Sequence, residues 1–493
     1  MRKLSKFFIP VILLILGVSV FIRGISFVDP DFGWHLREGQ VIIQSGIPIT
    51  DPFSYSMPSY HLIDHEWLTN VLTFIVYKNF GIYVLSAIFA FIFVLSLILV
   101  IPKKFKHYAP ILLLLGGSVM IGFAGIRTQE ITWFFFALLL KIIFDEDKWR
   151  KWKFFLPLIF LPWANLHGGF AIGIAVLFVA FIAETFKEKR IAYEKLKIFL
   201  ASVLVTFINP YGPRIWYEIW TTISDTSLRW TISEWTPGIL YFDLAFCILV
   251  ALSLFLILVY RAKIPFFKIA IYFLLLILAI SSARNVPLWA ICTILLTSEV
   301  SSFFITQVNK NRENVKRLEK LKKILIVVFS LVLLWEINSN LADAYNLDKY
   351  PQKAVNFLEK RHIKGNIFST YSVGGYLIWK LPGKRVFIDG RMPSWKRTGN
   401  YPNESNYAFK DYMRMISDEK FFKKEMVKYN ISYVLFPAPS KEKEKDSWLL
   451  TKARKLADKI FFDNNDFHVL SEDLTKIGLL KIYDDGKYVI YKR

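Results

Sequence analysis

The chain has few cysteines and few charged residues for its length. Only two of its 493 residues are cysteines, Cys247 and Cys292, and both lie within apolar runs. This excludes a disulfide framework and a cysteine-based zinc site. Charged residues make up 21% of the chain, whereas apolar residues make up 54% and aromatic residues 17%. Because the apolar residues form runs too long for the core of a soluble domain, a water-soluble enzyme is excluded.

The N-terminal apolar stretch lacks a signal-peptide cleavage site. The basic start MRKLSK precedes it, but no small-x-small motif stands before Asp29-Pro30-Asp31. We therefore expect an uncleaved first span with a cytoplasmic N-terminus. A spanning helix needs about 20 mostly apolar residues, and the apolar runs predict about eleven spans. They cover residues 7–27, 82–101, 109–125, 130–144, 153–166, 169–186, 196–209, 243–260, 265–282, 286–305 and 323–339.

Acidic residues are scarcer than basic ones, 40 against 62, which gives a net charge of +22. Such an excess is typical of proteins that bind nucleic acid or an anionic membrane surface. In the expected topology, however, the cytoplasmic loops carry 25 Lys and Arg, and the outer side of the membrane region carries 7. This asymmetry follows the positive-inside rule. We therefore expect a multi-pass protein of the cell membrane that contacts membrane lipids and no nucleic acid.

The two halves of the chain differ in pattern. Residues 1–342 predict a mainly α, polytopic bundle, and residues 343–493 predict an extracytoplasmic α/β domain. In the latter, strands are expected at 366–370, 385–389 and 431–436, helices at 351–362, 374–381 and 406–429, and a hairpin around Asp485-Gly486. Segment 66–80 is too short to span, so we expect a juxtamembrane helix after a first outer loop of residues 28–66.

The unusual polar residues of the membrane half all fall on the expected outer face. The candidate site residues are Asp29, Asp31, His35, Asp64, His65, Glu66, Arg127, Asn165, His167, Glu234 and Arg284. The loop 28–66 carries six acids and one arginine. Two carboxylates separated by Pro30 can converge on a divalent cation or a substrate hydroxyl, and outer arginines can bind a phosphate. The alternatives are ordinary Asp-Pro turn chemistry and arginines that only reach the headgroups.

With these residues in place, the chain resembles a bacterial family of polytopic proteins in the GT-C glycosyltransferase superfamily. That superfamily includes protein O-mannosyltransferases, lipid A aminoarabinose transferases and the catalytic subunit of oligosaccharyltransferase. The resemblance rests on DPDFGWHLREGQ (29–40), IPITDPFSYSMP (47–58), DHEWLTNVL (64–72), GIRTQE (125–130), WANLHGGFAIG (163–173), INPYG (208–212), ISEW (232–235), ARNVPLW (283–289), STYSVGGYLIW (369–379) and VFIDGR (386–391).

The resemblance implies a sugar donor linked to polyprenyl phosphate and used on the extracytoplasmic side. It places Asp31, with Asp29 beside it, at the acidic position of the first outer loop, as a base or a ligand of a cation such as Mg or Mn. By position, Arg127 and Arg284 would hold the lipid phosphate. The chain departs from the family pattern at Gly33, which stands where an aromatic residue is usual, and at Thr128, which replaces a proline. No clear copy of the WWD-type motif of oligosaccharyltransferase is present.

The expected function is therefore membrane glycosyl transfer to an acceptor on the extracytoplasmic face. The resemblance implies inverting transfer, with His35, Asp64 and Glu66 as second choices for the pocket. One alternative is an O-antigen polymerase or ligase, which would not need the acidic loop. Another is a transporter or receptor without enzymatic activity. Transporters usually show related halves with polar groups at the membrane midplane, and neither feature is present. The sugar, the acceptor and the oligomeric state do not follow from the sequence.

Overall fold

A computed structural model describes residues 2–26, 29–101, 109–225, 232–241, 244–308, 312–345, 350–438 and 473–493. Within it the chain forms two compact units, and neither is continuous in sequence. Unit 1 comprises residues 1–27, 80–219 and 231–345, and unit 2 comprises residues 28–79, 220–230 and 346–493. The first outer loop therefore folds together with the C-terminal segment.

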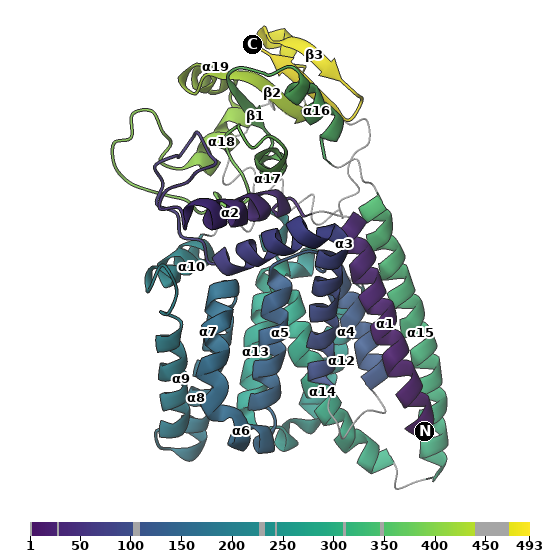
Figure 1. Ribbon diagram of the computed structural model, residues 1–493. Helices are drawn as coiled ribbons and strands as arrows, with labels where there is room; N and C mark the ends of the chain where they lie inside the picture. Colours follow the sequence, from purple (N-terminus) through teal and green to yellow (C-terminus); the bar gives the residue numbers. More distant parts are fainter. Residues whose placement is uncertain are drawn as a thin grey trace. The chain divides into compact units, whose positions relative to one another are not determined.

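Unit 1 is a bundle of apolar helices that lie side by side (Figure 1). Its helices are α1 (Arg2–Ser26), the second part of α3 (Trp67–Val100), α4 (Ala109–Ile121), α5 (Gln129–Ile143), α6 (Glu146–Trp152), α7 (Leu156–Leu166), α8 (Phe170–Glu188), α9 (Tyr193–Val205), α12 (Leu244–Tyr260), α13 (Phe266–Ser281), α14 (Val286–Val308) and α15 (Arg312–Tyr345). Helix α10 (Arg214–Ser224) passes from unit 1 into unit 2. Short 3-10 turns lie at Lys153–Phe155, Ser233–Trp235, Gly238–Tyr241, Arg261–Lys263 and Ala283–Asn285.

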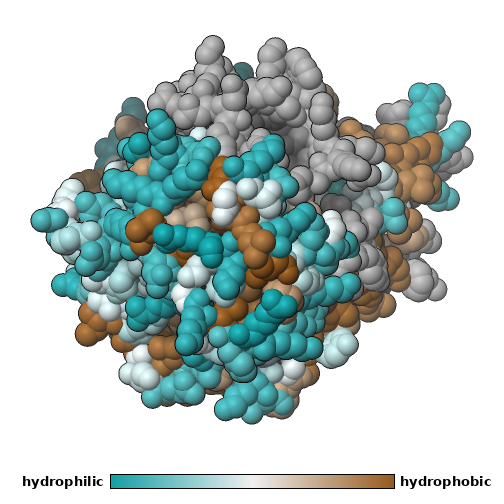
Figure 2. Space-filling model, turned by 90° about the horizontal axis from the view of Figure 1, so that it is seen from above, coloured by the Kyte–Doolittle hydropathy of each residue, from teal (hydrophilic) through white to brown (hydrophobic). Residues whose placement is uncertain are grey.

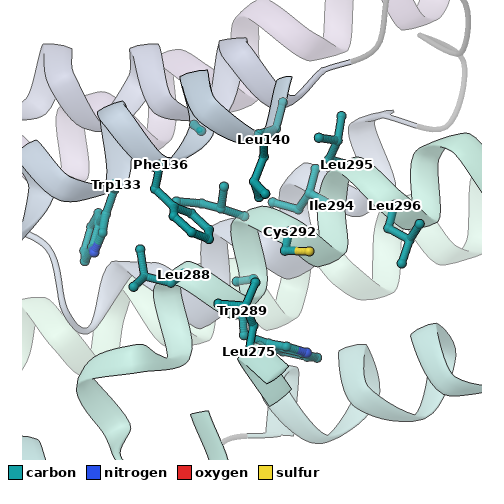
Figure 3. Packing of buried hydrophobic residues seen from close by; sticks show 14 of the residues in the cluster. Trp133, Phe136, Leu140, Leu275, Leu288, Trp289, Cys292, Ile294, Leu295 and Leu296 are labelled. Atoms are coloured by element: carbon teal, nitrogen blue, oxygen red, sulfur yellow. The ribbon is translucent and has the colours of Figure 1, made fainter. Parts of the chain in front are cut away.

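Large apolar side chains from most helices of unit 1 form its core, and every residue of α4 is buried. Trp133, Phe136 and Leu140 of α5 follow the spacing of an amphipathic helix, and all three are buried. Figure 3 shows them beside Trp289 and Cys292 of α14 in the same hydrophobic cluster. Cys292 therefore serves as a small apolar core residue.

Each of the eleven predicted spans coincides with a helix. Among the described residues, four segments are long and apolar enough to cross a membrane: Phe8–Ser26, Trp67–Val100, Phe170–Glu188 and Leu244–Lys263. Other helices are shorter than expected. Helix α7 has only 11 residues, begins at Leu156 and carries a proline in its first turn. At about 1.5 Å per residue, such a helix rises roughly 16 Å, well short of a hydrocarbon core of about 30 Å. The structure supports a multi-pass protein, and the number of spans stays a prediction.

Helix α3 contains the predicted juxtamembrane segment. Its helical geometry breaks at Gly81, where φ is 77° and ψ is −176°. A residue with a side chain adopts this conformation only with strain, and glycine adopts it readily. This break separates the helix that begins at Trp67 from the apolar helix after Gly81. It lies at the predicted boundary between the segment 66–80 and the span 82–101.

Unit 2 is built around a four-stranded mixed sheet of order β1-β2-β4-β3. Its elements are α2 (Phe32–Ser45), the first part of α3, α16 (Gln352–Lys360), β1 (Asn366–Ser369), α17 (Tyr371–Lys380), α18 (Ala408–Ser417), α19 (Glu419–Lys428), β2 (Ile431–Pro437), a 3-10 turn (Leu474–Ile477), β3 (Leu480–Asp484) and β4 (Tyr488–Lys492). Strand β2 is parallel to β1 and antiparallel to β4, and β3 and β4 form the predicted hairpin. The face of the molecule seen in Figure 2 is largely hydrophilic, with small separate hydrophobic patches.

Two elements of unit 2 differ from the prediction. The helix expected over 406–429 is interrupted at Asp418, whose extended backbone ends α18 and whose carboxylate accepts from the Phe421 amide to start α19. The strand expected at 385–389 makes only isolated bridges, in which Val386 lies between Ser54 and Ile367. The backbone of the first outer loop pairs with one edge of this segment. The Tyr55 amide donates a hydrogen bond to the Val386 carbonyl at 2.9 Å.

Glycines bring α2 and α17 of unit 2 into close contact. A Cβ on Gly33 would lie 2.1 Å from the Gly375 carbonyl oxygen, and one on Gly375 would lie 2.3 Å from the Pro30 carbonyl oxygen. Both distances involve backbone atoms, so any side chain at either position would push the helices apart. This contact requires glycine at both positions, and it places Pro30 against the STYSVGGYLIW segment.

Candidate functional site

The first carboxylates after the first span lie at the N-terminus of α2 in unit 2. Asp29 is buried, and its Oδ1 accepts a hydrogen bond from the Asp31 amide at 2.9 Å. This contact forms a local Asx turn before the helix. Asp31 is the N-cap residue, but its carboxylate makes no capping hydrogen bond. Its Oδ1 lies instead 1.7 Å from the position that a Cβ on Gly390 would take. Asp29 therefore shapes the turn, and Asp31 directs its carboxylate away from its own helix.

A second group of predicted residues forms a buried network in unit 2. The His35 Nδ1 atom lies 2.6 Å from Asn70 Oδ1, and Asn70 Nδ2 donates to Asp64 Oδ2 at 2.8 Å. The Asn70 amide thus points its oxygen at His35, so Nδ1 carries the proton of the ring. Glu66 Oε2 lies 3.6 Å from His35 Nε2, and Glu66 Oε1 lies 3.7 Å from His65 Nε2. The structure thus brings together His35, Asp64, His65 and Glu66.

Burial sets the protonation of this network. It lowers the pKa of His35 to about 4, even though the Asn70 hydrogen bond acts in the opposite direction. The imidazole is therefore neutral near pH 7. Burial also raises the pKa of Asp64 to about 6, against the effect of the hydrogen bonds from Glu66 and Asn70. Asp64 is therefore mostly ionised at pH 7 and takes up a proton just below neutral pH.

A buried ion-pair cluster around Arg391 lies outside the predicted site residues. Arg391 Nη2 donates to Asp389 Oδ2 at 2.7 Å, and Nη1 lies 2.9 Å from Asp51 Oδ1 and 3.8 Å from Glu38 Oε2. The Glu38 and Asp389 side chains are fully buried. The sequence indicates such a cluster, because loop 28–66 carries six acids and one arginine. If these acids are buried, a cation from another segment is needed to pair with them.

Glu38 faces more negative than positive charge. Its neighbours are Asp64, Asp51, Asp389 and Arg391, and Arg391 is already bound to two of them. The Glu38 carboxyl group is hydrogen-bonded to that of Asp64, and Arg391 Nη1 lies 3.8 Å from Glu38 Oε2. Burial, followed by the charge of Asp64, raises the pKa of Glu38 well above its ordinary value. Burial and the surrounding carboxylates thus favour the protonated form of Glu38.

Replacing Glu38 with glutamine is expected to stabilise unit 2 at alkaline pH. The stabilisation that comes with a raised carboxyl pKa is fully present below the unfolded value and is lost as the pH rises through the folded value. A glutamine cannot ionise, so the variant should gain on the order of 1–3 kcal/mol at pH 8. His35 titrates alike in both proteins, so its contribution cancels when Glu38→Gln is compared with the parent protein.

Thermal unfolding of the purified protein between pH 6.5 and 8.5 measures this effect. The exposed Glu359 provides the matched control, because Glu359→Gln should leave the pH dependence unchanged. Equal melting temperatures for Glu38→Gln and the parent protein at pH 8 would show that burial does not raise the pKa of Glu38.

The predicted arginines of unit 1 meet at one short turn. Arg127 forms a salt bridge with Glu234, and Gln129 Nε2 donates to Glu234 Oε2 at 3.1 Å. The guanidinium of Arg284 lies 4.7 Å from the centre of the Trp235 ring. The Ser233–Trp235 turn thus brings Arg127, Glu234 and Arg284 together, and a shared ligand for the two arginines stays a prediction. Arg127 and Glu234 side chains are 15% and 28% exposed, so solvent reaches the pair.

Asn165 and His167 hold neighbouring segments of unit 1. Asn165 Nδ2 donates to the carbonyls of Leu161 and Ile208, both at 2.9 Å. His167 Nδ1 accepts from the Gly169 amide and lies 2.8 Å from Thr132 Oγ1. These contacts are typical of a packing role, and a substrate contact for either residue stays a prediction.

No group of three or more His, Cys, Asp or Glu side chains among the described residues is placed to hold a metal ion. Mg²⁺ is commonly bound by one or two carboxylates together with substrate phosphates. A divalent cation at Asp31 therefore stays a prediction.

Comparisons with known proteins identify the fold. No family model matches the sequence, and no curated protein matches it. The structure is similar to the crystal structure of ArnT from Cupriavidus metallidurans bound to undecaprenyl phosphate, with 12% identity and a TM-score of 0.53. That match covers 100% of this chain and 98% of the other. Two structures of the Archaeoglobus fulgidus oligosaccharyltransferase match 88% and 89% of this chain, at 13% and 14% identity and TM-scores of 0.48. One of them is AglB in complex with an inhibitory peptide and a dolichol-phosphate. The expected structural resemblance to GT-C membrane glycosyltransferases is thus confirmed at the level of the fold.

Proposed function

We propose that this chain is a membrane glycosyltransferase that moves a sugar from a polyprenyl-phosphate-linked donor to an acceptor hydroxyl on the extracytoplasmic face. The observation that carries the proposal is the whole-length similarity to ArnT in its complex with undecaprenyl phosphate. The free orientation of the Asp31 carboxylate and the meeting of Arg127 and Arg284 at one turn support it.

The proposed reaction is a single inverting displacement. The acceptor oxygen attacks the anomeric carbon, the bond from that carbon to the phosphate oxygen breaks, and the lipid phosphate leaves with the electron pair. Asp31 takes the proton of the acceptor hydroxyl. Its carboxylate is suited to this role because it does not cap its own helix and is only partly buried.

Arg127 and Arg284 are proposed to bind the lipid phosphate. Guanidinium groups pair with phosphate through two parallel hydrogen bonds, and the partial exposure of the Arg127–Glu234 pair leaves it accessible to a ligand. The phosphate would replace the Glu234 carboxylate as a partner of Arg127. Glu234 would thereby hold the guanidinium in place before the lipid arrives.

Substitution of these arginines is expected to weaken lipid binding. Hydrogen bonds to charged groups contribute about 1.5–3 kcal/mol, so Arg127→Gln and Arg284→Gln should each reduce the affinity for undecaprenyl phosphate by roughly 10- to 150-fold. Binding to the purified protein in nanodiscs can be measured by native mass spectrometry. Arg150→Gln is the matched control, because Arg150 is 74% exposed and pairs only with Glu146 among the described residues.

The outcome of this measurement also separates the alternatives. A protein that binds no polyprenyl phosphate would be better explained as a transporter or receptor. Binding that is lost in the arginine variants, together with release of undecaprenyl phosphate from a panel of lipid-linked sugars, is expected for the proposed transferase. Mass spectrometry of the lipid extract detects that release.

A further inference from the structure

The segment Asp389–Arg391 forms a rigid turn in the C-terminal part of unit 2. The Asp389 carboxylate accepts three hydrogen bonds from Arg391: from the backbone amide at 3.0 Å, from Nε at 2.9 Å and from Nη2 at 2.7 Å. The Arg391 side chain is 5% exposed, and that of Asp389 is fully buried. Charge-assisted bonds in such an environment are strong, so the conformation of the residue between them is tightly constrained.

Arg391 also ties this turn to the first outer loop. Its Nη1 atom lies 2.9 Å from Asp51 Oδ1 and 3.8 Å from Glu38 Oε2. The guanidinium lies 4.9 Å from the centre of the Phe53 ring and 5.9 Å from that of Trp34. The turn is thus fixed to the loop by charge and by aromatic contacts at the same time.

Gly390 lies where this turn meets Asp31. A Cβ at Gly390 would be 1.7 Å from Asp31 Oδ1 and 3.1 Å from Asp31 Oδ2. The Tyr371 hydroxyl donates to the Gly390 carbonyl at 3.4 Å, which holds the other side of the residue. The Asp31 carboxylate therefore occupies space that only a glycine leaves open.

We propose that the Asp389–Gly390–Arg391 turn positions the reactive carboxylate of Asp31, with Arg391 fixing the turn and Gly390 providing the space that the carboxylate fills. This inference rests on the proposed role of Asp31 as a base. It makes the C-terminal segment part of the reaction site. Gly390 and Arg391 act as positioning residues, because they act through Asp31.

Gly390→Ala is the selective test. The methyl group meets the end of a short side chain, which can rotate, so the fold should survive while the carboxylate moves. Misplacement of a reacting group by about 1 Å can reduce a rate roughly 100-fold. We expect a loss of this size in kcat, measured as release of undecaprenyl phosphate, with little change in KM for the lipid-linked donor. Gly383→Ala is the control, because a Cβ there meets nothing within 4 Å.

A combination with Asp31→Asn separates positioning from a general structural effect. If Gly390 acts through Asp31, Gly390→Ala should cause no further loss of kcat in the Asp31→Asn background. The proposal would be overturned if the fold-losses of the two single variants multiplied in the double variant. Full activity of Gly390→Ala would overturn it as well.

An unfolding measurement tests the same contact without any activity. Gly390→Ala should lower the melting temperature of the parent protein slightly, and it should not lower that of the Asp31→Ala variant, in which the carboxylate is gone. An equal decrease in both backgrounds would contradict the contact. If the unmodified protein transfers no sugar, the proposed function fails, and this coupling still shows whether Gly390 places Asp31.

Discussion

Replacing Asp31 with asparagine is expected to reduce the rate of sugar transfer by roughly 10²- to 10⁴-fold, the range typical for loss of a general base. The asparagine side chain is almost isosteric, so it should still fit against Gly390. It cannot accept the proton of an acceptor hydroxyl at neutral pH. The affinity for undecaprenyl phosphate should stay unchanged, because the proposed lipid contacts are made by Arg127 and Arg284.

Asp29→Asn is the matched control for this experiment. Asp29 accepts the Asp31 amide through Oδ1, and an asparagine oxygen can make the same bond. We expect the control to lose less than about tenfold in rate, within the 1.4 kcal/mol that a factor of ten represents. A wild-type rate for Asp31→Asn would rule out the assignment of the base. An undiminished rate for the Asp29→Asn, Asp31→Asn double variant would favour a polymerase or ligase of the O-antigen type.

Replacing Arg391 with methionine is expected to destabilise unit 2 by roughly 3–5 kcal/mol, the usual cost of removing one partner of a buried ion pair. The methionine fills much of the same volume. It leaves Asp51 and Asp389 buried without their cation, and these carboxylates must then either take up protons or draw water into the core. The resulting loss is comparable to the whole stability of many domains.

The effect can be measured by thermal and urea unfolding of the purified protein in detergent. Arg414→Met is the control, because Arg414 is 60% exposed and its pairing with Asp418 should contribute at most about 1 kcal/mol. Adding Asp51→Asn and Asp389→Asn to Arg391→Met should recover part of the lost stability, since the orphaned charges are then gone. Equal stability of Arg391→Met and Arg414→Met would show that the cluster does not stabilise the fold.

The sequence predicts local features of this protein well because they depend on neighbouring residues. Apolar runs of about 20 residues locate the helices of unit 1, and the Asp485-Gly486 turn locates the β3–β4 hairpin. The charge pattern predicts that Arg127, Glu234 and Arg284 share one face of the bundle, and the structure places all three at the Ser233–Trp235 turn.

Contacts between distant segments could not be predicted in this way. Ser54 bridges to Val386 and Asp51 pairs with Arg391, yet nothing in the local pattern of either segment specifies its partner. The strand expected at 385–389 is predicted from its own residues alone. Its actual conformation depends on the bridge between Val386 and Ser54 of the first outer loop. The unmatched acids of loop 28–66 indicated that a cation was needed and left its source open.

Unit 2 is built from segments that lie far apart in the sequence, and this affects how it folds during synthesis. The Ser56 hydroxyl donates to the Phe387 carbonyl across 331 positions of the chain. At about 5–20 residues per second, the ribosome needs roughly 15–65 s to reach Phe387 after it has added Ser56. During that interval Asp51 lacks Arg391, its partner in the folded protein, and must remain hydrated. A nascent chain that stops before Arg391 therefore exposes an incompletely folded segment, which quality-control proteases can recognise.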